Sequence, residues 1–291
     1  MRYDTEWKDY GVIATGSGMK LERFGEVVLL RPDPQIIWEP PFDLYAYPGL
    51  SAVYMRNSAG GGHWEYRKKV PEEFVIGWRD LRFSLKLMGF KHTGIFPEQA
   101  YHWAKCIDLI KGAGREINVL NLFAYTGGAT VACASAGAKV CHVDAAKAMC
   151  ERAGRNMALS GLKDRPVRYI VDDCFKFVER EIRRGNKYDA VIMDPPSYGR
   201  GPRGELWKLE DKIYGLVSLT SEIISDNPLF YLLNSYTTGL QPTVMKNVLE
   251  LVFEKIPHNA EAYELGLPTE QKNIILPCGA GAMLIFDPKK H

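Results

Sequence analysis

Glycines and carboxylates that follow short apolar runs are the residues of this chain best placed to do chemistry. In chain order, the sites after four such runs are Gly127 and Gly128, then Asp144, then Asp172 and Asp173, and last Asp194. Glycine permits a tight turn and lets a ligand approach the backbone closely. A carboxylate at a strand end can accept hydrogen bonds from ribose hydroxyls or from the exocyclic amine of a purine. Together these residue types favour a nucleoside-binding site, although each alone is also typical of a turn or a helix N-cap.

An alternation of strand-like and helix-like stretches from residue 118 onward would bring these sites together. We expect strands over residues 117–123, 139–143, 167–171, 190–193 and 229–233, and helices over 130–136, 147–159, 175–184 and 214–225. Two further strands, 273–276 and 283–286, are expected to form a terminal hairpin around the glycines at 279 and 281. Strict alternation predicts an α/β fold with a Rossmann-like, mainly parallel seven-stranded sheet. Ligands bind such sheets outside the carboxyl ends of the strands, where the four sites would lie.

The first 80 residues have a different composition, which is rich in glycine, proline and aromatic residues. Short β-type runs, 27–30 and 36–38, are each followed by prolines, a pattern that favours short strands over long helices. Residues 57–62, which end in three glycines, are expected to form a flexible loop. We therefore predict a small β-rich N-terminal domain over residues 1–80 that helps to bind substrate, and a larger cofactor-binding α/β domain over residues 81–291.

Composition places the chain among ordinary soluble proteins. Its 291 residues are 46% hydrophobic and 25% charged, and the formal net charge of +2 is too weak to identify a nucleic-acid partner by itself. No apolar run approaches the roughly 20 residues needed to cross a bilayer, and the first residues lack an apolar signal core. The six cysteines form no Cys-x-x-Cys pair and are typical of reduced thiols. We expect a cytoplasmic protein with no metal and no membrane contact, and the oligomeric state stays open.

The segment Phe123, Ala124, Tyr125, Thr126 and Gly127 after the first strand indicates the nature of the cofactor. It lacks the G-x-G-x-x-G spacing that a dinucleotide requires, where a pyrophosphate lies against the backbone. S-adenosyl-L-methionine has no phosphate, and its amino-acid and sulfonium groups need fewer glycines. We therefore predict S-adenosyl-L-methionine as the cofactor, with its methionine part held by this segment.

The other strand-end residues take their expected roles from this cofactor. Asp144, with Ala145 beside it, would accept from both ribose hydroxyls, and Asp173, with Cys174 beside it, would accept from the adenine amine. Asp194 would stand next to the transferable methyl group. Four such features in the right chain order are hard to explain as turns and helix caps alone.

Residues Asp194, Pro195, Pro196, Ser197 and Tyr198 form the candidate acceptor site. Two successive prolines fix the backbone and leave carbonyls available as acceptors. A carboxylate and carbonyls can together bind both N–H groups of an exocyclic amine, which turns its lone pair toward the methyl group. An aromatic side chain beside this turn can stack on a base taken out of its helix. The alternative interpretation is a rigid turn after a strand.

Residues 118–200 resemble a class I S-adenosylmethionine-dependent methyltransferase. The run from Asn121 to Gly128 is similar to that of a family that includes bacterial large-subunit ribosomal RNA methyltransferases of the cytosine carbon-5 type. The segments 20–25 and 92–99 resemble two further elements of that family, and the second lies beside the cofactor there. The resemblance implies that Phe96 and Gln99 are cofactor neighbours and that the acceptor is a base of RNA, in the first place ribosomal RNA.

The sequence departs from this family at the nucleophile. Carbon-5 methylation of a pyrimidine needs a thiolate that attacks carbon-6. In the family that cysteine follows the fourth or fifth strand, whereas segments 194–198 and 234–239 here contain none. Cys174 and Cys278 lie elsewhere and are typical of inert buried thiols. Nitrogen methylation fits the residues better and the family pattern favours carbon-5, so the acceptor atom stays open. The N-terminal part is also short for the RNA-binding PUA domain that many relatives carry.

Two groups of basic residues interleaved with aromatics are suited to contact RNA phosphates and bases. The first group is Arg200, Arg203, Lys208 and Lys212 around Trp207, and its glycine- and proline-rich segment indicates a mobile lid. The second group is Arg67, Lys68 and Lys69 among Trp64, Tyr66 and Trp78. A solvated charged face explains either group almost as well. Two rival functions remain: a methyltransferase of proteins or small molecules, and a non-catalytic RNA-binding module of the same fold.

Overall fold

The computed structural model describes residues 1–57, 61–89, 91–200, 206–237 and 239–288. The chain divides into two compact units, each described here by itself. The larger unit comprises Met1, His102–Leu265 and Cys278–His291, and the smaller unit comprises Arg2–Tyr101 and Gly266–Pro277.

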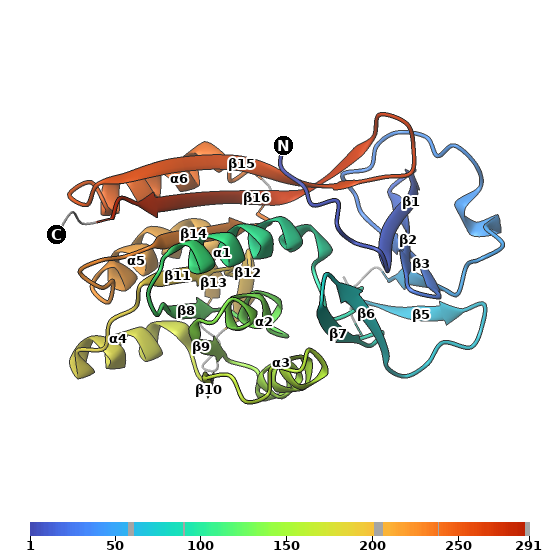
Figure 1. Ribbon diagram of the computed structural model, residues 1–291. Coiled ribbons are helices and arrows are strands. Elements are labelled where there is room, and N and C mark those ends of the chain that lie inside the picture. The colour runs from blue at the N-terminus through green and yellow to red at the C-terminus, as the bar shows by residue number, and fades with distance from the viewer. Residues whose placement is uncertain (58–60, 90, 201–205, 238, 289–291) are drawn as a thin grey trace. The chain divides into compact units, whose positions relative to one another are not determined.

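A seven-stranded sheet forms the centre of the larger unit, in the order β10-β9-β8-β11-β14-β16-β15 (Figure 1). Its strands are β8 (Asn118–Leu122), β9 (Lys139–Asp144), β10 (Val167–Val171), β11 (Ala190–Met193), β14 (Phe230–Ser235), β15 (His258–Pro268) and β16 (Ile275–Phe286). The pairs among β8, β9, β10, β11 and β14 are parallel, and β16 runs antiparallel to β14. The predicted Rossmann-like, mainly parallel seven-stranded sheet is therefore confirmed.

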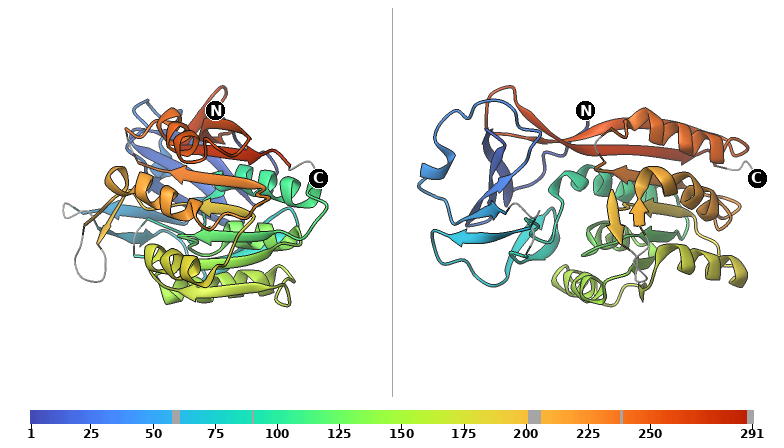
Figure 2. Two further views of the ribbon diagram at one scale, coloured as in Figure 1. Left: turned by 90° about the vertical axis from the view of Figure 1, so that its left-hand side faces the viewer. Right: turned by 180° about the vertical axis from the view of Figure 1, so that it is seen from behind.

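In the described part of the chain, six α-helices flank these strands and cover both faces of the sheet. They are α1 (Ala100–Gly112), α2 (Gly128–Ser135), α3 (Lys147–Leu159), α4 (Cys174–Arg184), α5 (Leu209–Ser221) and α6 (Pro242–Val252). Figure 1 shows α1, α2 and α3 on the near face, and the rear view in Figure 2 shows α5 and α6 on the opposite one. The core that α4, α5 and α6 close contains apolar strand residues such as Leu120, Val191 and Leu233, all without solvent exposure. These strands read as continuous apolar runs because helices cover both faces.

Local signals set the helix boundaries closely. Helix α3 spans the predicted 147–159, and Gly161 follows it with a φ of 70°. Helix α4 begins where the Asp173 carboxylate accepts a hydrogen bond from the Lys176 amide, and it ends at Gly185 with a φ of 69°. These are the side-chain N-cap and the left-handed glycine C-cap that the sequence pattern favours.

The predicted terminal hairpin around Gly279 and Gly281 is wrong. Both glycines lie inside one continuous strand, β16, and the hairpin partner of β16 is β15, which the pattern did not indicate. A Cβ at position 281 would lie 2.6 Å from Nε2 of His102. Glycine within a strand here marks a close approach of neighbouring atoms and not a turn.

The smaller unit contains a five-stranded sheet in the order β1-β2-β3-β4-β5 and a separate hairpin, β6-β7. The strands are β1 (Tyr10–Gly16), β2 (Met19–Phe24), β3 (Val27–Pro32), β4 (Ala52–Arg56), β5 (Gly62–Tyr66), β6 (Phe74–Trp78) and β7 (Leu81–Leu85). The predicted β-rich N-terminal region is confirmed, but residues 36–38, expected as a strand, form none. Half of the loop predicted over 57–62, residues 58–60, lies outside the described residues, and Gly62 begins β5.

The compact units divide the chain elsewhere than between residues 80 and 81. Residues 81–101 group with the smaller unit, and so does the segment Gly266–Pro277 between β15 and β16. Within the smaller unit, the Thr15 amide donates to Oε1 of Gln271 at 2.7 Å, a bond between residues far apart in the chain. The predicted domain boundary between residues 80 and 81 stays a prediction, because the division into compact units does not show which part of the chain binds substrate.

Candidate active site

The ends of four adjacent parallel strands carry the predicted site residues. In the sheet register Leu122 lies beside both Val143 and Met193, and Val171 lies beside Asp144. Backbone hydrogen bonds continue past the strand ends: Ala124 donates to Val143 at 3.0 Å, Asp172 to Asp144 at 3.1 Å, and Asp194 to Leu122 at 3.4 Å. The structure therefore brings the loop at 123–128 together with Asp144, Asp172 and Asp194, at the sheet edge where α/β folds bind ligands.

The loop after β8 has a strained backbone. Phe123, Tyr125 and Gly127 have φ angles of 54°, 49° and 83°. Left-handed conformations are rare for bulky residues, and they persist where the surrounding structure fixes them. Here the Asp144 carboxylate is the restraint: its Oδ2 accepts from the Tyr125 amide and its Oδ1 from the Ala146 amide, each at 2.8 Å.

The two glycines of this loop are required by helix packing. A Cβ at Gly127 would lie 2.7 Å from Cβ of Ala153 in α3, and a Cβ at Gly128 would lie 2.5 Å from Cζ2 of Trp103 in α1. Both glycines let α2 begin close to its neighbouring helices. The interpretation that they admit a ligand stays a prediction.

A buried polar network beneath the loop was not predicted. Nδ2 of Asn121 donates to Oγ1 of Thr130 at 3.0 Å, and that oxygen lies 2.9 Å from Nδ1 of His142. Burial lowers the pKa of His142 to about 4, so its ring is neutral at pH 7. Asn156 donates to the Thr126 carbonyl at 2.9 Å and ties α3 to the loop. Polar residues within the apolar runs of β8 and β9 were the signal that could have revealed this support.

Asp173 caps a helix, which is the structural alternative that the sequence left open. Its Oδ1 accepts from the Lys176 amide at 3.1 Å, while Asp172 accepts from the Asp173 amide and forms an ion pair with Arg180. Neighbouring Cys174 is buried, and burial raises the pKa of its thiol far above the usual range, which disfavours a thiolate. A role for Asp173 at an adenine amine stays a prediction.

The Asp-Pro-Pro turn follows β11 directly. Asp194 is half-buried, Pro195 is buried and Pro196 is exposed. The Pro196 carbonyl accepts a hydrogen bond from the indole N–H of Trp207, and the Ser197 carbonyl accepts from the Leu209 amide at 3.1 Å. Tyr198, which begins the short strand β12 (Tyr198–Arg200), has 58% of its surface exposed and is accessible for stacking.

The two predicted groups of basic residues are not equally covered by the described part of the chain. Arg203 and the side chain of Arg200 lie outside the described residues, while Lys208 and Lys212 are exposed. In the second group Arg67 pairs with Glu65 at 3.9 Å, and Lys68 donates to the Pro48 carbonyl at 2.9 Å. Its predicted aromatic neighbour Trp78 is fully buried, so Trp78 cannot stack on a base and that part of the prediction is wrong.

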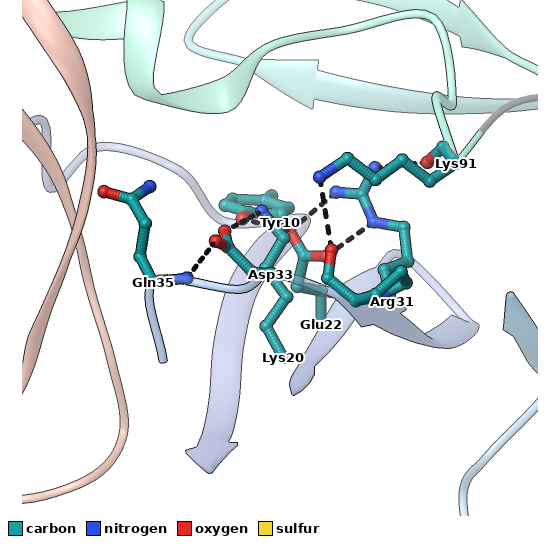
Figure 3. A network of polar contacts seen from close by, with 8 residues as sticks. Tyr10, Lys20, Glu22, Arg31, Asp33, Gln35 and Lys91 are labelled. Carbon is teal, nitrogen blue, oxygen red and sulfur yellow. Dashed lines mark hydrogen bonds and ion pairs between the residues drawn. The ribbon is translucent and has the colours of Figure 1, made fainter. Parts of the chain in front are cut away.

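Phe96 and Gln99 lie in the smaller unit, at the start and end of a single turn of 3₁₀ helix, η2 (Pro97–Gln99), and Gln99 is buried. Lys91, which comes directly before segment 92–99, belongs to a polar network that the sequence did not reveal (Figure 3). Arg31 donates to Glu22 through Nε at 2.7 Å and Nη2 at 2.8 Å, and to the Lys91 carbonyl through Nη1 at 2.8 Å. The network thereby holds the residue directly before segment 92–99. A cofactor contact of Phe96 and Gln99 stays a prediction.

Glu22 is the centre of this network and is completely buried. Tyr10 also donates to its Oε1, at 2.8 Å, and Lys20 lies 3.9 Å from the same oxygen. Burial alone would raise the pKa of Glu22, but the charges of Arg31 and Lys20 and the hydrogen bonds outweigh it and lower the pKa to about 2. Lys20 also pairs with Asp33 at 3.5 Å. The element 20–25 that resembles a family segment is therefore a structural core element of the smaller unit.

Among the described residues, no group of three or more His, Cys, Asp or Glu side chains is arranged to hold a metal ion. In the same part of the chain, no helix is long and apolar enough to span a bilayer.

Comparison with known proteins identifies the kind of enzyme that has this geometry. Residues 53–217 match the model of a family described as S-adenosylmethionine-dependent methyltransferase. A ribosomal RNA large subunit methyltransferase K/L of Shewanella frigidimarina is 34% identical over 213 residues, which are 69% of this chain and 29% of the relative. The chain thus spans less than a third of the length of that curated relative.

Solved structures agree. A SAM-dependent methyltransferase from Agrobacterium tumefaciens superposes with a TM-score of 0.91 at 31% identity, over 98% of this chain and 92% of the other. A putative SAM-dependent methyltransferase from Streptococcus mutans superposes with a TM-score of 0.76 at 21% identity, over 97% and 76% of the two chains. The second likeness concerns the fold alone.

Proposed function

Because the chain belongs to the S-adenosylmethionine-dependent methyltransferase family, we propose that it transfers the methyl group of S-adenosylmethionine to a base of RNA, in the first place ribosomal RNA. The observation that carries the acceptor class is the similarity to a relative named as a ribosomal RNA large subunit methyltransferase. The Asp-Pro-Pro turn at the strand edge supports it, since carbonyls and a carboxylate there suit a nucleobase amine. We also propose that the enzyme acts in the cytoplasm.

The strand edge fits the cofactor in chemical terms. The start of α2 offers backbone N–H donors to a carboxylate, next to the strained loop 123–127 that would hold the methionine part. Asp144 has both oxygens bonded to backbone amides, which orients the carboxylate without consuming its remaining lone pairs. We assign Asp144 to the ribose hydroxyls and Asp173 to the adenine amine, and we retain Phe96 and Gln99 as further cofactor neighbours.

The acceptor atom that these residues favour is an exocyclic or ring nitrogen. When bound, the cofactor supplies an electrophilic methyl group on a sulfonium. Asp194 and the Pro195 carbonyl would accept the amine hydrogens and direct the lone pair, Tyr198 would stack on the base, and Ser197 would complete the turn. The cofactor would give up its methyl group and leave as a neutral thioether, and the Asp194 carboxylate would accept the proton that the nitrogen loses. A carbon-5 reaction would instead need a thiolate, which the burial of Cys174 disfavours.

The test is transfer of a tritiated methyl group from S-adenosylmethionine to three acceptor pools: purified ribosomal RNA, total protein and small-molecule extract. We expect label in RNA, lost on RNase digestion and reduced at least about 10-fold by Asp194→Asn, which removes the carboxylate charge. Nucleoside analysis of the labelled RNA then distinguishes nitrogen from carbon-5 products. Label in protein or small molecules, with RNA unlabelled, would overturn the RNA assignment.

A further inference from the structure

A small hairpin follows the Asp-Pro-Pro turn, and beyond Tyr198 its residues have no role in the function proposed above. Its strands are β12 and β13 (Leu206–Lys208), which pair antiparallel with Gly199 opposite Trp207. Helix α5 begins directly after β13. Trp207 is therefore held between a strand pair and a helix start, close in sequence to the candidate acceptor site but outside its motif.

Trp207 contacts the continuations of three parallel strands. Its indole N–H donates to the Pro196 carbonyl, after β11. Its ring lies 5.7 Å from that of Phe123, after β8, with the planes tilted by 48°. It also lies 5.9 Å from the ring of Phe175 at an edge-to-face angle of 66°, and Phe175 is in α4, after β10. One half-buried side chain thus joins the predicted methionine, adenine and acceptor parts of the site.

The hydrogen bond matters because proline has no amide N–H. The Pro195-Pro196 backbone can be oriented from outside only through its carbonyls. The indole N–H is a donor without acceptor capacity, and it engages one lone pair of the Pro196 carbonyl. The acceptors proposed for the base are the Asp194 carboxylate and the Pro195 carbonyl.

The ring contacts matter because Phe123 lies in the strained loop. Its φ of 54° places it in a conformation that neighbouring contacts must maintain. Edge-to-face and tilted aromatic pairs at these separations are attractive and directional. A ligand that displaces Phe123 or Phe175 would therefore move Trp207, and with it the Pro196 carbonyl.

We propose that Trp207 is a positioning residue that couples occupation of the cofactor site to the geometry of the Asp-Pro-Pro turn. The position of its ring depends on Phe123 and Phe175, which it contacts. Its indole N–H holds the orientation of the Pro196 carbonyl through a hydrogen bond. The acceptor half of this inference rests on the proposed methyl transfer, whereas the cofactor half does not.

Trp207→Phe retains an aromatic ring and removes the N–H. We expect kcat for RNA methylation to fall about 5- to 10-fold, as the loss of one neutral hydrogen bond implies, with KM for RNA and the calorimetric affinity for S-adenosylhomocysteine changed less than about 2-fold. Benzothienylalanine at position 207, which replaces N–H by sulfur in a ring of the same shape, should show the same kcat loss. Trp38→Phe is the matched control, because Trp38 donates its indole N–H to Oγ1 of Thr15 in the smaller unit.

A second readout tests the cofactor half without RNA. Addition of S-adenosylhomocysteine should change the tryptophan fluorescence of the wild type and of Trp38→Phe equally, and the change should be clearly smaller in Trp207→Phe, in which Trp103 beside Gly128 can still respond. If the fluorescence responds but no RNA is methylated, the coupling to the cofactor stands and the RNA assignment fails. The positioning role is overturned if both variants at 207 keep the wild-type kcat, or if they only lower the melting temperature and leave the activity per folded enzyme unchanged.

Discussion

At the scale of single residues, Asp144 carries two tasks that the sequence could not separate. It restrains the strained loop through two backbone amides, and it is the proposed ribose acceptor. A strand-end aspartate is often only a cap, so its position alone could not distinguish the two. The structure shows the first task and leaves the second to a measurement.

Asp144→Ala should weaken binding of S-adenosylmethionine by about 10- to 100-fold, because hydrogen bonds to a charged group contribute roughly 1.5–3 kcal/mol. Isothermal titration calorimetry measures this directly. Asp164→Ala, at an exposed turn position, is the control and should bind as the wild type does. Equal affinity of both variants and the wild type would contradict the assignment of Asp144 to the ribose.

Glu22 is the residue whose ionisation matters most for the smaller unit. Its folded-state pKa is about 2 against an ordinary value of 4.5, so ionised Glu22 stabilises the fold. Because the folded pKa is depressed, this contribution is complete above about pH 4.5 and is lost as the pH falls toward 2. From the difference in pKa it is on the order of 3 kcal/mol.

Glu22→Gln should therefore lower the melting temperature strongly at pH 7 and much less at pH 3, measured by circular dichroism at both pH values. Removal of the charge leaves Arg31 buried without its partner, which adds to the loss. Glu72→Gln, which removes an exposed ion pair with Lys86, should leave the melting temperature nearly unchanged. A uniform effect of Glu22→Gln at both pH values would show that its charge is not the cause.

At the scale of secondary-structure elements, α2 begins against two neighbouring helices, and the pair of glycines makes this possible. The sequence located the glycines correctly, at the turn between β8 and α2. It suggested a tight turn and a close ligand as the reasons for them, and the ligand stays a prediction, while the structure shows that Ala153 and Trp103 occupy the space a Cβ would need. Glycine identity reveals that something lies close, and only the packing reveals what.

Gly128→Ala should destabilise the larger unit by about 1–3 kcal/mol, the usual cost of overpacking. The new methyl group would meet ring atoms of Trp103 that phenylalanine lacks. In a double-mutant cycle followed by urea denaturation, Trp103→Phe should therefore recover part of the loss caused by Gly128→Ala. Strictly additive effects would mean that the predicted contact is not what excludes alanine.

At the scale of the whole molecule, the formal net charge of +2 gives little long-range attraction to RNA, so local groups must supply the phosphate contacts. The described part of the chain offers Arg67, Lys68 and Lys69 in the smaller unit, and Lys208 and Lys212 in the larger one. The partners of Arg67 and Lys68 are an exposed glutamate and a backbone carbonyl, which RNA phosphates could replace.

The combined variant Arg67→Ala, Lys68→Ala and Lys69→Ala should lower the slope of log K for RNA against log salt by about 2–3, with the affinity for S-adenosylmethionine unchanged. Fluorescence anisotropy over a salt series measures the slope. The charge-matched control is Lys111→Ala, Lys163→Ala and Lys255→Ala, all at exposed positions. An equal change of slope in both variants would exclude a specific role for the 67–69 group.

The sequence by itself determined the strands β8 to β11, the helices α3 and α4, and the order in which the site residues follow strand ends. These features depend on periodicity, caps and turn residues within a few positions of one another, and parallel strands then share one edge. Helix α1, helix α6 and strand β15 escaped prediction, and glycines inside β16 were mistaken for a turn.

Only the tertiary structure shows which side chains that are distant in the sequence contact one another. Trp207 meets Phe123 and Phe175, Arg31 meets Glu22 and the Lys91 carbonyl, and Gly281 lies against His102. None of these contacts has a local signature, because each joins residues whose proximity follows from strand order and helix packing and not from their spacing in the chain. The sequence could predict where the chemical groups lie because their positions depend on residues close in the chain. The contacts that hold those groups in place depend on tertiary packing, so only the structure shows them.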